Sequence, residues 1–291
     1  MSAVATARKP RRRFSLRKDW IGLTGAAILI AIVGIAIFAD FITTHDPLTQ
    51  RVINRFLPPA FMDRGKAAYL LGTDQLGRDL LSRVVHGSRI SLAIGAITAV
   101  FTTLLGSALG IAAAYARGTF EAFFLRSIDI HTAFPFMVIA VAVVAVVGAS
   151  PTTIVVTLML WFWVPFARVA HSETIRVLRQ EYVAAAGLSG SGGLRTLWRH
   201  VIPNIVPPLI VIFTFTAAQV VVAESALSFL GLGIQPPQPT WGSIISQGRD
   251  VMNIAPWIVL VPAIAVTLLV LAANMLGEWL REWLDPHSKK L

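Results

Sequence analysis

Six apolar runs, of which those at 134–147 and 152–166 are short, constrain the fold of this 291-residue chain more than any other feature. Hydrophobic residues make up 55% of the sequence and charged residues only 14%. A soluble domain needs more charged surface to stay in solution, whereas a helix of about 20 apolar residues crosses a bilayer. We therefore predict an all-α integral membrane protein with six transmembrane helices. The apolar runs cover residues 20–41, 90–114, 134–147, 152–166, 205–222 and 256–276.

A basic tail over residues 1–19 precedes the first apolar run, which raises the alternative of a signal peptide. The apolar core of this run is too long for a signal peptide, and no small-x-small cleavage site follows it. We interpret residues 20–41 as the first transmembrane helix. A basic cluster ahead of a span marks the cytoplasmic side and attracts anionic membrane lipid. The cluster consists of Arg8, Lys9, Arg11, Arg12, Arg13, Arg17 and Lys18.

The distribution of basic residues predicts that both termini lie in the cytoplasm. Six spans return the chain to its starting side, and the segments after the second and fourth spans are rich in arginine. The connection 148–151 carries no charge, and the segment 224–255 carries only Arg249 as a base. The loop 42–89 has seven basic and four acidic residues, but long loops cross largely regardless of charge, so we place it outside. The remaining chain divides into a core over residues 90–286 and a cytoplasmic tail over residues 287–291.

Composition excludes several classes of function. The net charge is +10, but no aromatic-interleaved basic domain accompanies the basic tail, so nucleic-acid binding is not expected. The chain has no cysteine, which excludes disulfides and thiolate metal sites. It has no phosphate-binding loop motif, no metal-ligand spacing among its six histidines and no nucleophile elbow in an aqueous segment. We therefore predict no catalytic, cofactor-binding or metal site in this chain.

Ionisable residues are nearly absent from the predicted spans. Asp40, Asp129 and Glu224 all fall near span ends. A stand-alone secondary transporter usually keeps acidic residues or histidines at mid-membrane, and a channel needs a filter. Neither pattern is present, so we expect the energy source to be a separate protein.

Small residues in the second span predict a close helix–helix contact. Gly106 and Gly110 lie four residues apart, a spacing that lets two helices approach closely. Two interpretations remain open, which are general packing within the bundle and a dedicated dimer face.

A polar segment over residues 171–204 lies between the fourth and fifth spans. Apolar residues at helical spacing fill its first half, glycines interrupt it at 190, 192 and 193, and a second amphipathic pattern ends at Pro203. We predict a helix-turn-helix that faces water and is contacted by another protein. The alternative is an ordinary amphipathic helix at the membrane interface.

The polar segment reads EYVAAA over residues 181–186, followed by Gly190 and by HVIPN over residues 200–204. It resembles the "EAA" loop of permeases of binding-protein-dependent ABC importers. The resemblance implies a coupling helix that inserts into a groove of an ATPase subunit. The family's signature glutamate is Ala184 here, and Glu181, one helical turn earlier, could present a carboxylate instead. The coupling residues implied are Glu181, Ala184, Ala185, Ala186, Gly187, Gly190, His200 and Pro203.

Other motifs extend the resemblance to nearly the whole chain. LGTDQLGRD over residues 71–79, AFP over 133–135 and ESALSFLGLG over 224–233 look like those of dipeptide, oligopeptide and nickel permeases. The match is to the C-type subunit, which pairs with a homologous B-type subunit. For the outer motifs two roles remain open: local turns, with Trp241 and Trp257 as interfacial anchors, or docking of an external binding protein.

The resemblance implies a permease in the plasma (inner) membrane of a prokaryote that forms half of a pore for di- or oligopeptides. Its implied partners are the B-type permease, two ABC ATPase subunits, an external substrate-binding protein and membrane lipid. ATP and magnesium would be used by the ATPases, with no cofactor bound by this chain. The alternatives are the same machinery importing nickel or metal chelates or glutathione, and a stand-alone secondary transporter. The substrate path within the chain stays open.

Overall fold

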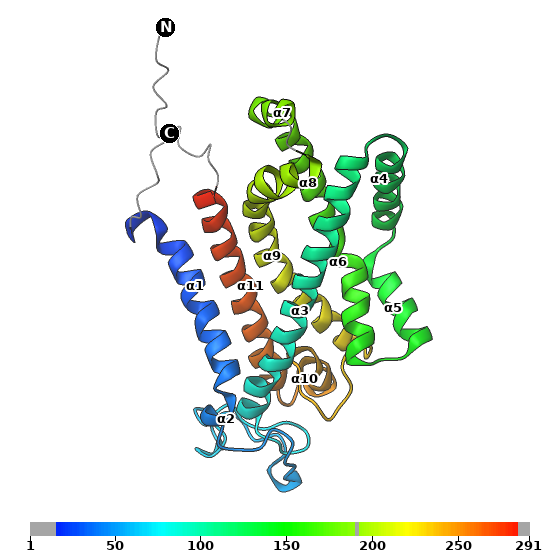
Figure 1. Ribbon diagram of the computed structural model, residues 1–291. Helices are drawn as coiled ribbons and strands as arrows, with labels where there is room; N and C mark the ends of the chain where they lie inside the picture. Colours follow the sequence, from blue (N-terminus) through cyan, green and yellow to red (C-terminus); the bar gives the residue numbers. More distant parts are fainter. Residues whose placement is uncertain (1–15, 190–191, 285–291) are drawn as a thin grey trace.

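Figure 1 shows the computed structural model, which describes residues 16–189 and 192–284. Apart from connecting loops and an isolated bridge between Thr73 and Asp79, the described residues are helical. Their α-helices are α1 (Leu16–Ile37), α2 (Ala39–Ile42), α3 (Leu80–Ala116), α4 (Gly118–Ala133), α5 (Phe136–Val147), α6 (Pro151–Leu178), α7 (Glu181–Leu188), α8 (Gly193–Thr196), α9 (Ile202–Phe229), α10 (Trp241–Gly248) and α11 (Trp257–Leu284). Short 3₁₀-helices cover Val52–Asn54 and Arg249–Val251, and a π-helix covers Leu197–Val201.

Five helices of the described chain are long and apolar enough to cross a membrane. The number of candidate spans rises to six if the bent α4–α5 pair is counted as one span. The prediction of an all-α membrane protein is thus confirmed. The third predicted span, 134–147, corresponds only to α5, whose 12 residues extend about 18 Å, less than the roughly 30 Å of the hydrocarbon core. A bend of 84° separates α5 from α4. Pro135 causes the break, because it forces the preceding Phe134 out of the helical conformation.

Two helix boundaries differ from the sequence prediction. Helix α3 begins at Leu80, ten residues earlier than expected and inside the predicted outer loop, because the Asp79 side chain caps it by accepting a hydrogen bond from the Ser82 amide. Helix α6 runs to Leu178, so the first amphipathic pattern of the polar segment is divided between the end of α6 and α7. The residues around 178–181 therefore form a corner and not one continuous helix.

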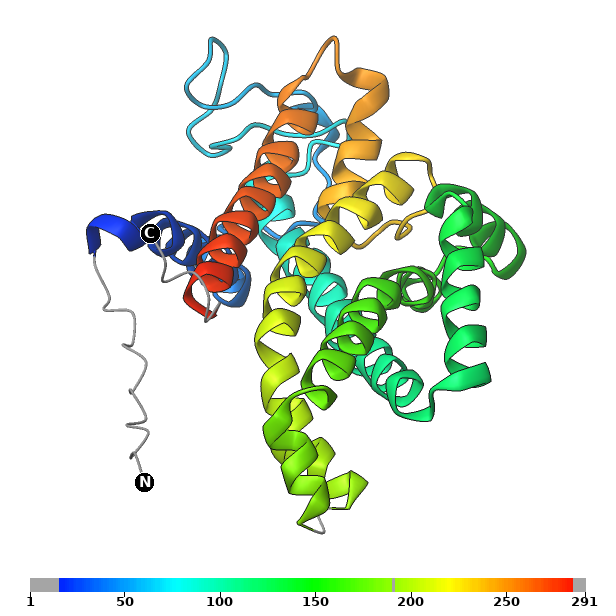
Figure 2. The same ribbon diagram turned by 90° about the horizontal axis from the view of Figure 1, so that it is seen from above.

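The two ends of the bundle have different structures. The beginning of α1, the end of α11 and the α7–α8 segment lie at one end, here named the α7 end (Figure 1). Helices α2 and α10 and the loop 43–79 lie at the opposite end, here named the outer cap. Seen from above, α1 and α11 lie at one side of the bundle, and α4 and α5 lie at the other (Figure 2).

Helices α3 and α6 approach each other most closely at two glycines. A Cβ atom on Gly106 would lie 2.3 Å from the carbonyl oxygen of Trp163, and one on Gly110 would lie 2.3 Å from that of Ala167. Such short distances leave no room for a side chain. The structure thus places both glycines in packing within the chain, which is one of the two interpretations that the sequence left open.

We predict that Gly110→Ala destabilises the chain, whereas Gly34→Ala does not. The new methyl group at 110 would push α3 from α6, and overpacking of this kind costs about 1–3 kcal/mol. Nothing lies within 4 Å of a Cβ on Gly34, so alanine there should only favour the helix. Thermal unfolding in detergent measures both effects, and equal unfolding temperatures for the two variants would contradict the packing described here.

Candidate functional sites at the two ends of the bundle

One buried side chain attaches α7 to the bundle. Val183 is 5% exposed and is the buried residue of α7. It belongs to an apolar cluster with residues of α6, of the π-helix and of α9. Because this cluster includes Val177, Val201 and Ile205, α7 packs against the end of α6 and the start of α9. Sequence reasoning did not single out Val183, since its packing partners lie in three different elements.

A second, polar contact joins α7 to the π-helix and the start of α9, and we call this packed region the joint. The ring of Tyr182 meets the ring of His200 edge-on, with 5.7 Å between the centroids. The side-chain amide of Asn204 donates to the Tyr182 hydroxyl at 3.4 Å and to the carbonyl oxygen of His200 at 2.6 Å. Of the predicted coupling residues, His200 therefore belongs to the joint that holds α7 to the start of α9.

The predicted coupling residues occupy different parts of this segment. Within the described part of the chain, Glu181 has no ion pair or side-chain hydrogen bond. Gly190 lies outside the described residues. Ala186 is half-buried, and the exposed members of the set are Glu181, Ala184, Ala185, Gly187 and Pro203.

Large apolar side chains are exposed at the α7 end. Leu188 is 92% exposed, Leu194 is 71% exposed and Trp198 is 65% exposed. Arg195 and Arg199 border the last two and line a shallow hollow with them. We name these five residues the docking surface. An apolar surface with basic neighbours at the tip of a protruding segment has the composition of a protein-contact site, with apolar anchors surrounded by polar groups.

The outer cap contains a cluster of buried, paired charges. Asp74 is fully buried, and its carboxylate accepts hydrogen bonds from the side chains of Arg78, at 2.6 Å, and Arg83. The Gln247 side-chain oxygen accepts from the same two guanidinium groups at 2.9 and 3.1 Å. Trp257 donates from its indole nitrogen to the carbonyl oxygen of Thr73 at 3.1 Å. The motif at 71–79 therefore fastens the outer loop onto α3, α10 and α11.

A second buried network joins α9 to α10 and α3. The Glu224 side chain is fully buried and accepts from Ser228 at 2.7 Å and from Thr240 at 3.1 Å. Trp241 is 2% exposed and donates from its indole nitrogen to the Val84 carbonyl at 3.0 Å. The expectation of Trp241 as an interfacial anchor is thus wrong, because its ring lies in the core. Its partner is 157 residues away in sequence.

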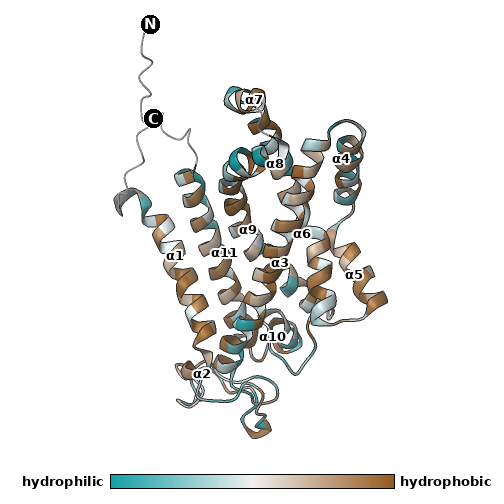
Figure 3. Ribbon diagram, in the orientation of Figure 1, coloured by the Kyte–Doolittle hydropathy of each residue, from teal (hydrophilic) through white to brown (hydrophobic). Residues whose placement is uncertain are grey.

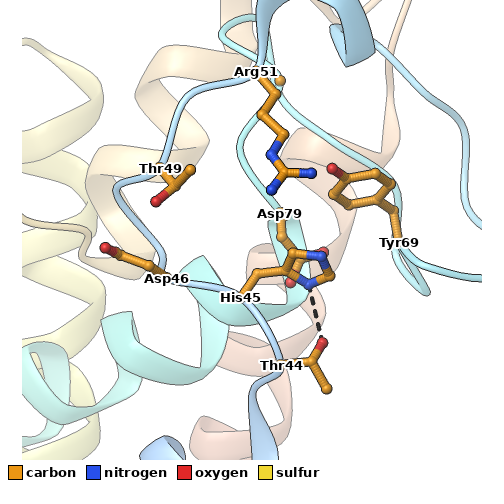
Figure 4. A pocket seen from close by; sticks show the side chains of 8 residues that line it. Thr44, His45, Asp46, Thr49, Arg51, Tyr69 and Asp79 are labelled. Carbon is orange, nitrogen blue, oxygen red and sulfur yellow. Dashed lines mark hydrogen bonds between the residues drawn. The ribbon is translucent and has the colours of Figure 1, made fainter.

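A small cleft of about 160 Å³ opens on the outer cap (Figure 4). The His45 ring stacks on Tyr69 at 5.0 Å between centroids, and its Nδ1 lies 3.0 Å from the Thr44 hydroxyl. The remaining lining residues are Asp46, Thr49, Arg51, Gly77 and Asp79. Acidic and basic groups both line the cleft, so its charge selects no ligand class.

An ion pair attaches α2 to α3 beside the cap. Arg89 donates to the Asp40 carboxylate at 2.8 Å and to the Ala36 carbonyl at 2.6 Å. The hydrogen bond from Arg89 holds the pKa of the exposed Asp40 carboxyl below its ordinary value. The contribution of this pair is therefore present above the ordinary carboxyl pKa and is lost as the pH falls through the lowered value.

Comparison with known proteins identifies the family. Residues 104–290 match the family described as binding-protein-dependent transport system inner membrane component. Residues 11–59 match the N-terminal transmembrane domain of oligopeptide transport permease C. The first match covers more than half of the chain, so this chain belongs to the permeases of binding-protein-dependent ABC transporters. It is a non-catalytic, multi-pass subunit of the inner membrane, in a system that includes a binding protein and an ATPase.

Curated relatives cover almost the full chain. A Brucella suis protein named as a permease of a peptide transport system is 39% identical over 98% of this chain and 92% of its own length. The di/tripeptide transport system permease protein DppC of Pseudomonas aeruginosa is 38% identical over 92% of this chain and 88% of its own length. The glutathione transport system permease protein GsiD of Pectobacterium atrosepticum is 33% identical over 98% and 93%.

A solved structure supports the fold independently. The methionine ABC transporter MetNI, in an inward-facing conformation, matches with a TM-score of 0.54 and 17% identity, over 68% of this chain and 96% of that chain. At this identity the match concerns the fold alone, which is the helical bundle of an ABC permease.

We predict that Asp74→Asn strongly destabilises the chain, because it leaves two buried guanidinium groups without a counter-charge. Breaking a buried ion pair from one side costs about 3–5 kcal/mol. Asp63→Asn on the exposed part of the same loop is the matched control and should have little effect. Unfolding in denaturant compares the two variants, and a stable D74N protein would show that the outer loop does not depend on this network.

Proposed function

We propose that this chain forms half of the translocation pore of a peptide importer and couples to ATPase subunits through the segment from Glu181 to Pro203. The docking surface supports the proposal best, because it exposes apolar anchors on a segment whose base is packed between α6 and α9. The relatives named for peptide transport support the cargo class.

In this proposal the α7 end and both termini face the cytoplasm. The arginine-rich segments that follow the second and fourth predicted spans lie at the α7 end. Basic residues accumulate in cytoplasmic loops, so this end is the one available to ATPase subunits. The outer cap then faces the external binding protein.

Coupling would proceed by rigid displacement. When two ATPase subunits close on ATP, they pull the docking surface, and the joint around Val183 and Tyr182 passes this displacement to α6 and α9. Nucleotide can shift an inward–outward equilibrium only through contacts that differ between the two states, and the docking surface supplies such contacts. ATP and magnesium are used by the ATPases, and this chain contributes no cofactor.

The complete pore would include a homologous B-type permease, and the membrane lipid surrounds both subunits. Dipeptides or oligopeptides are the proposed cargo. Glutathione is the specific alternative, because a glutathione permease is similar over nearly the whole chain. Nickel or metal chelates are a further alternative. Uptake of labelled dipeptide, oligopeptide, glutathione and nickel by a strain lacking this chain, with and without the gene restored, separates them.

Single cysteines test the docking surface directly, because the chain has none of its own. In the full complex, Leu188→Cys should cross-link to a cysteine in the groove of the ATPase subunit. Phe61→Cys, which is 77% exposed in the outer loop, should not. Cross-linking at 61 with none at 188 would reverse the proposed orientation.

We also expect Glu181 to replace the family's glutamate at position 184. Glu181→Ala should weaken ATPase binding severalfold, because it removes the free carboxylate from α7. Adding Ala184→Glu to that variant should restore binding, since both side chains are exposed about one helical turn apart. Co-purification of the ATPase measures binding, and full binding by E181A alone would show that α7 needs no carboxylate.

A further inference from the structure

Large apolar side chains are exposed on the outer loop as well as at the α7 end. Ile53 is 93% exposed, Phe61 is 77% exposed and Val52 is 58% exposed. All three belong to the loop 43–79, which lies at the end of the molecule opposite to α7 (Figure 1). Figure 3 shows hydrophobic residues on the turn of this loop that extends furthest from the bundle.

The segments that carry these side chains are neighbours in the fold. Lys66 donates from Nζ to the side-chain oxygen of Asn54 at 3.1 Å, and the side-chain amide of Asn54 donates to the Tyr69 hydroxyl at 3.1 Å. These bonds bring the turn over residues 59–65 next to the 3₁₀-helix Val52–Asn54. The exposed apolar side chains therefore gather on one part of the loop, and a gathered apolar patch marks an interaction site more often than single scattered residues do.

The base of the loop is fixed to the bundle. Phe56 and Leu71 pack against the buried core cluster that contains Trp241. The buried Asp74 network joins the end of the loop to α3 and α10. The apolar tip is thus held outward on a packed base, and a surface that is already ordered loses little conformational entropy when a partner binds.

Basic side chains border the apolar ones. The exposed charged residues of the loop comprise four basic and two acidic side chains, which are Arg51, Arg55, Arg64, Lys66, Asp46 and Asp63. Within residues 16–189 and 192–284, none of these six side chains forms an ion pair. We name the four basic residues together with Val52, Ile53 and Phe61 the loop surface. Its apolar centre and basic border have the composition of a protein interface whose partner carries the opposite charge.

A protein is a better partner for the loop surface than lipid is. The candidate spans contact lipid along their sides, whereas the loop extends beyond α2 and α10 at the end of the bundle (Figure 1). The family to which the chain belongs is binding-protein-dependent. In the proposed orientation, the external binding protein reaches the permease from this end.

We propose that the loop surface is the site on this chain at which the external binding protein docks, and that the binding protein presents an apolar patch bordered by acidic residues. The inference rests on the proposed function, since it requires the outer cap to face the outside. The apolar side chains supply most of the affinity, because a few desolvated anchors dominate most interfaces. The basic side chains speed the encounter and fix the orientation of the partner.

Serine substitutions test the apolar centre. Ile53→Ser and Phe61→Ser should leave thermal stability unchanged, because both side chains already lie in water. Each should weaken binding of the system's purified binding protein to the complete complex by about tenfold or more. Ile254→Ser is the matched control, since Ile254 is 66% exposed between α10 and α11 at the same end of the bundle, and it should bind as the unmodified complex does. Unchanged binding by both loop variants would overturn the proposal.

Charge reversal tests the basic border. Arg55→Glu and Arg64→Glu should each slow association severalfold at low salt and flatten its dependence on salt, because charges at an interface border steer the encounter. Arg179→Glu makes the same change of charge at the α7 end and should leave association unchanged. Stopped-flow measurement of binding-protein association compares the three variants. An equal effect of R179E would show that net charge, and not the loop surface, attracts the partner.

A fluorescent label on Phe61→Cys identifies the occupant. In nanodiscs that contain the complete complex and anionic lipid, the label should report water and should move to an apolar environment when the binding protein is added. Quenching by spin-labelled lipid before that addition would assign the surface to the membrane, and photo-cross-linking to the B-type permease would assign it to that subunit. Either result would overturn the proposal. Intact Leu188→Cys cross-linking to the ATPase in the same complex shows that such a failure concerns the loop surface and not the proposed orientation or coupling.

Discussion

The close approach of α3 and α6 is the contact on which the rest of the structure depends. The hydrophobic effect does not drive helices together inside a lipid bilayer, so the association of spans relies on tight packing of small residues. Gly106 and Gly110 allow α6 to lie against α3 backbone to backbone. Helix α6 in turn holds α4 through two ion pairs and α7 through the cluster around Val183. Loss of this contact would displace α4 and α7, the two elements that α6 holds.

The two ends of the bundle each have a feature that bears on function. At the outer cap, Asp74 and Glu224 are buried with hydrogen-bonding partners, so the loops are closed upon the spans. At the α7 end, Leu188 and Trp198 stay exposed although the base of their segment is packed. Exposing large apolar side chains to water is unfavourable in free energy, and a bound protein partner would remove that contact with water.

The sequence was sufficient for the class, because apolar run length is a local property. The motif at 181–204 is local too, and it predicts where the coupling segment lies. It could not reveal the 84° bend at Phe134, since periodicity carries no information on the direction of a broken helix. Trp241 was misplaced for a related reason, because its partner Val84 is near only in the fold. The coupling role of Gly190 stays a prediction, as do the coupling roles of the other motif residues.

The central claim is that the docking surface and the α7-end portions of α6 and α9 move as one body. Spin labels at Leu188 and at the exposed Ser172, in the α7-end portion of α6, allow their distance to be measured in the complete complex by pulsed electron resonance. The account predicts one narrow distance that is the same without nucleotide and with ATP trapped. A distance that changes or broadens on ATP binding would show that α7 pivots independently, and it would contradict the account.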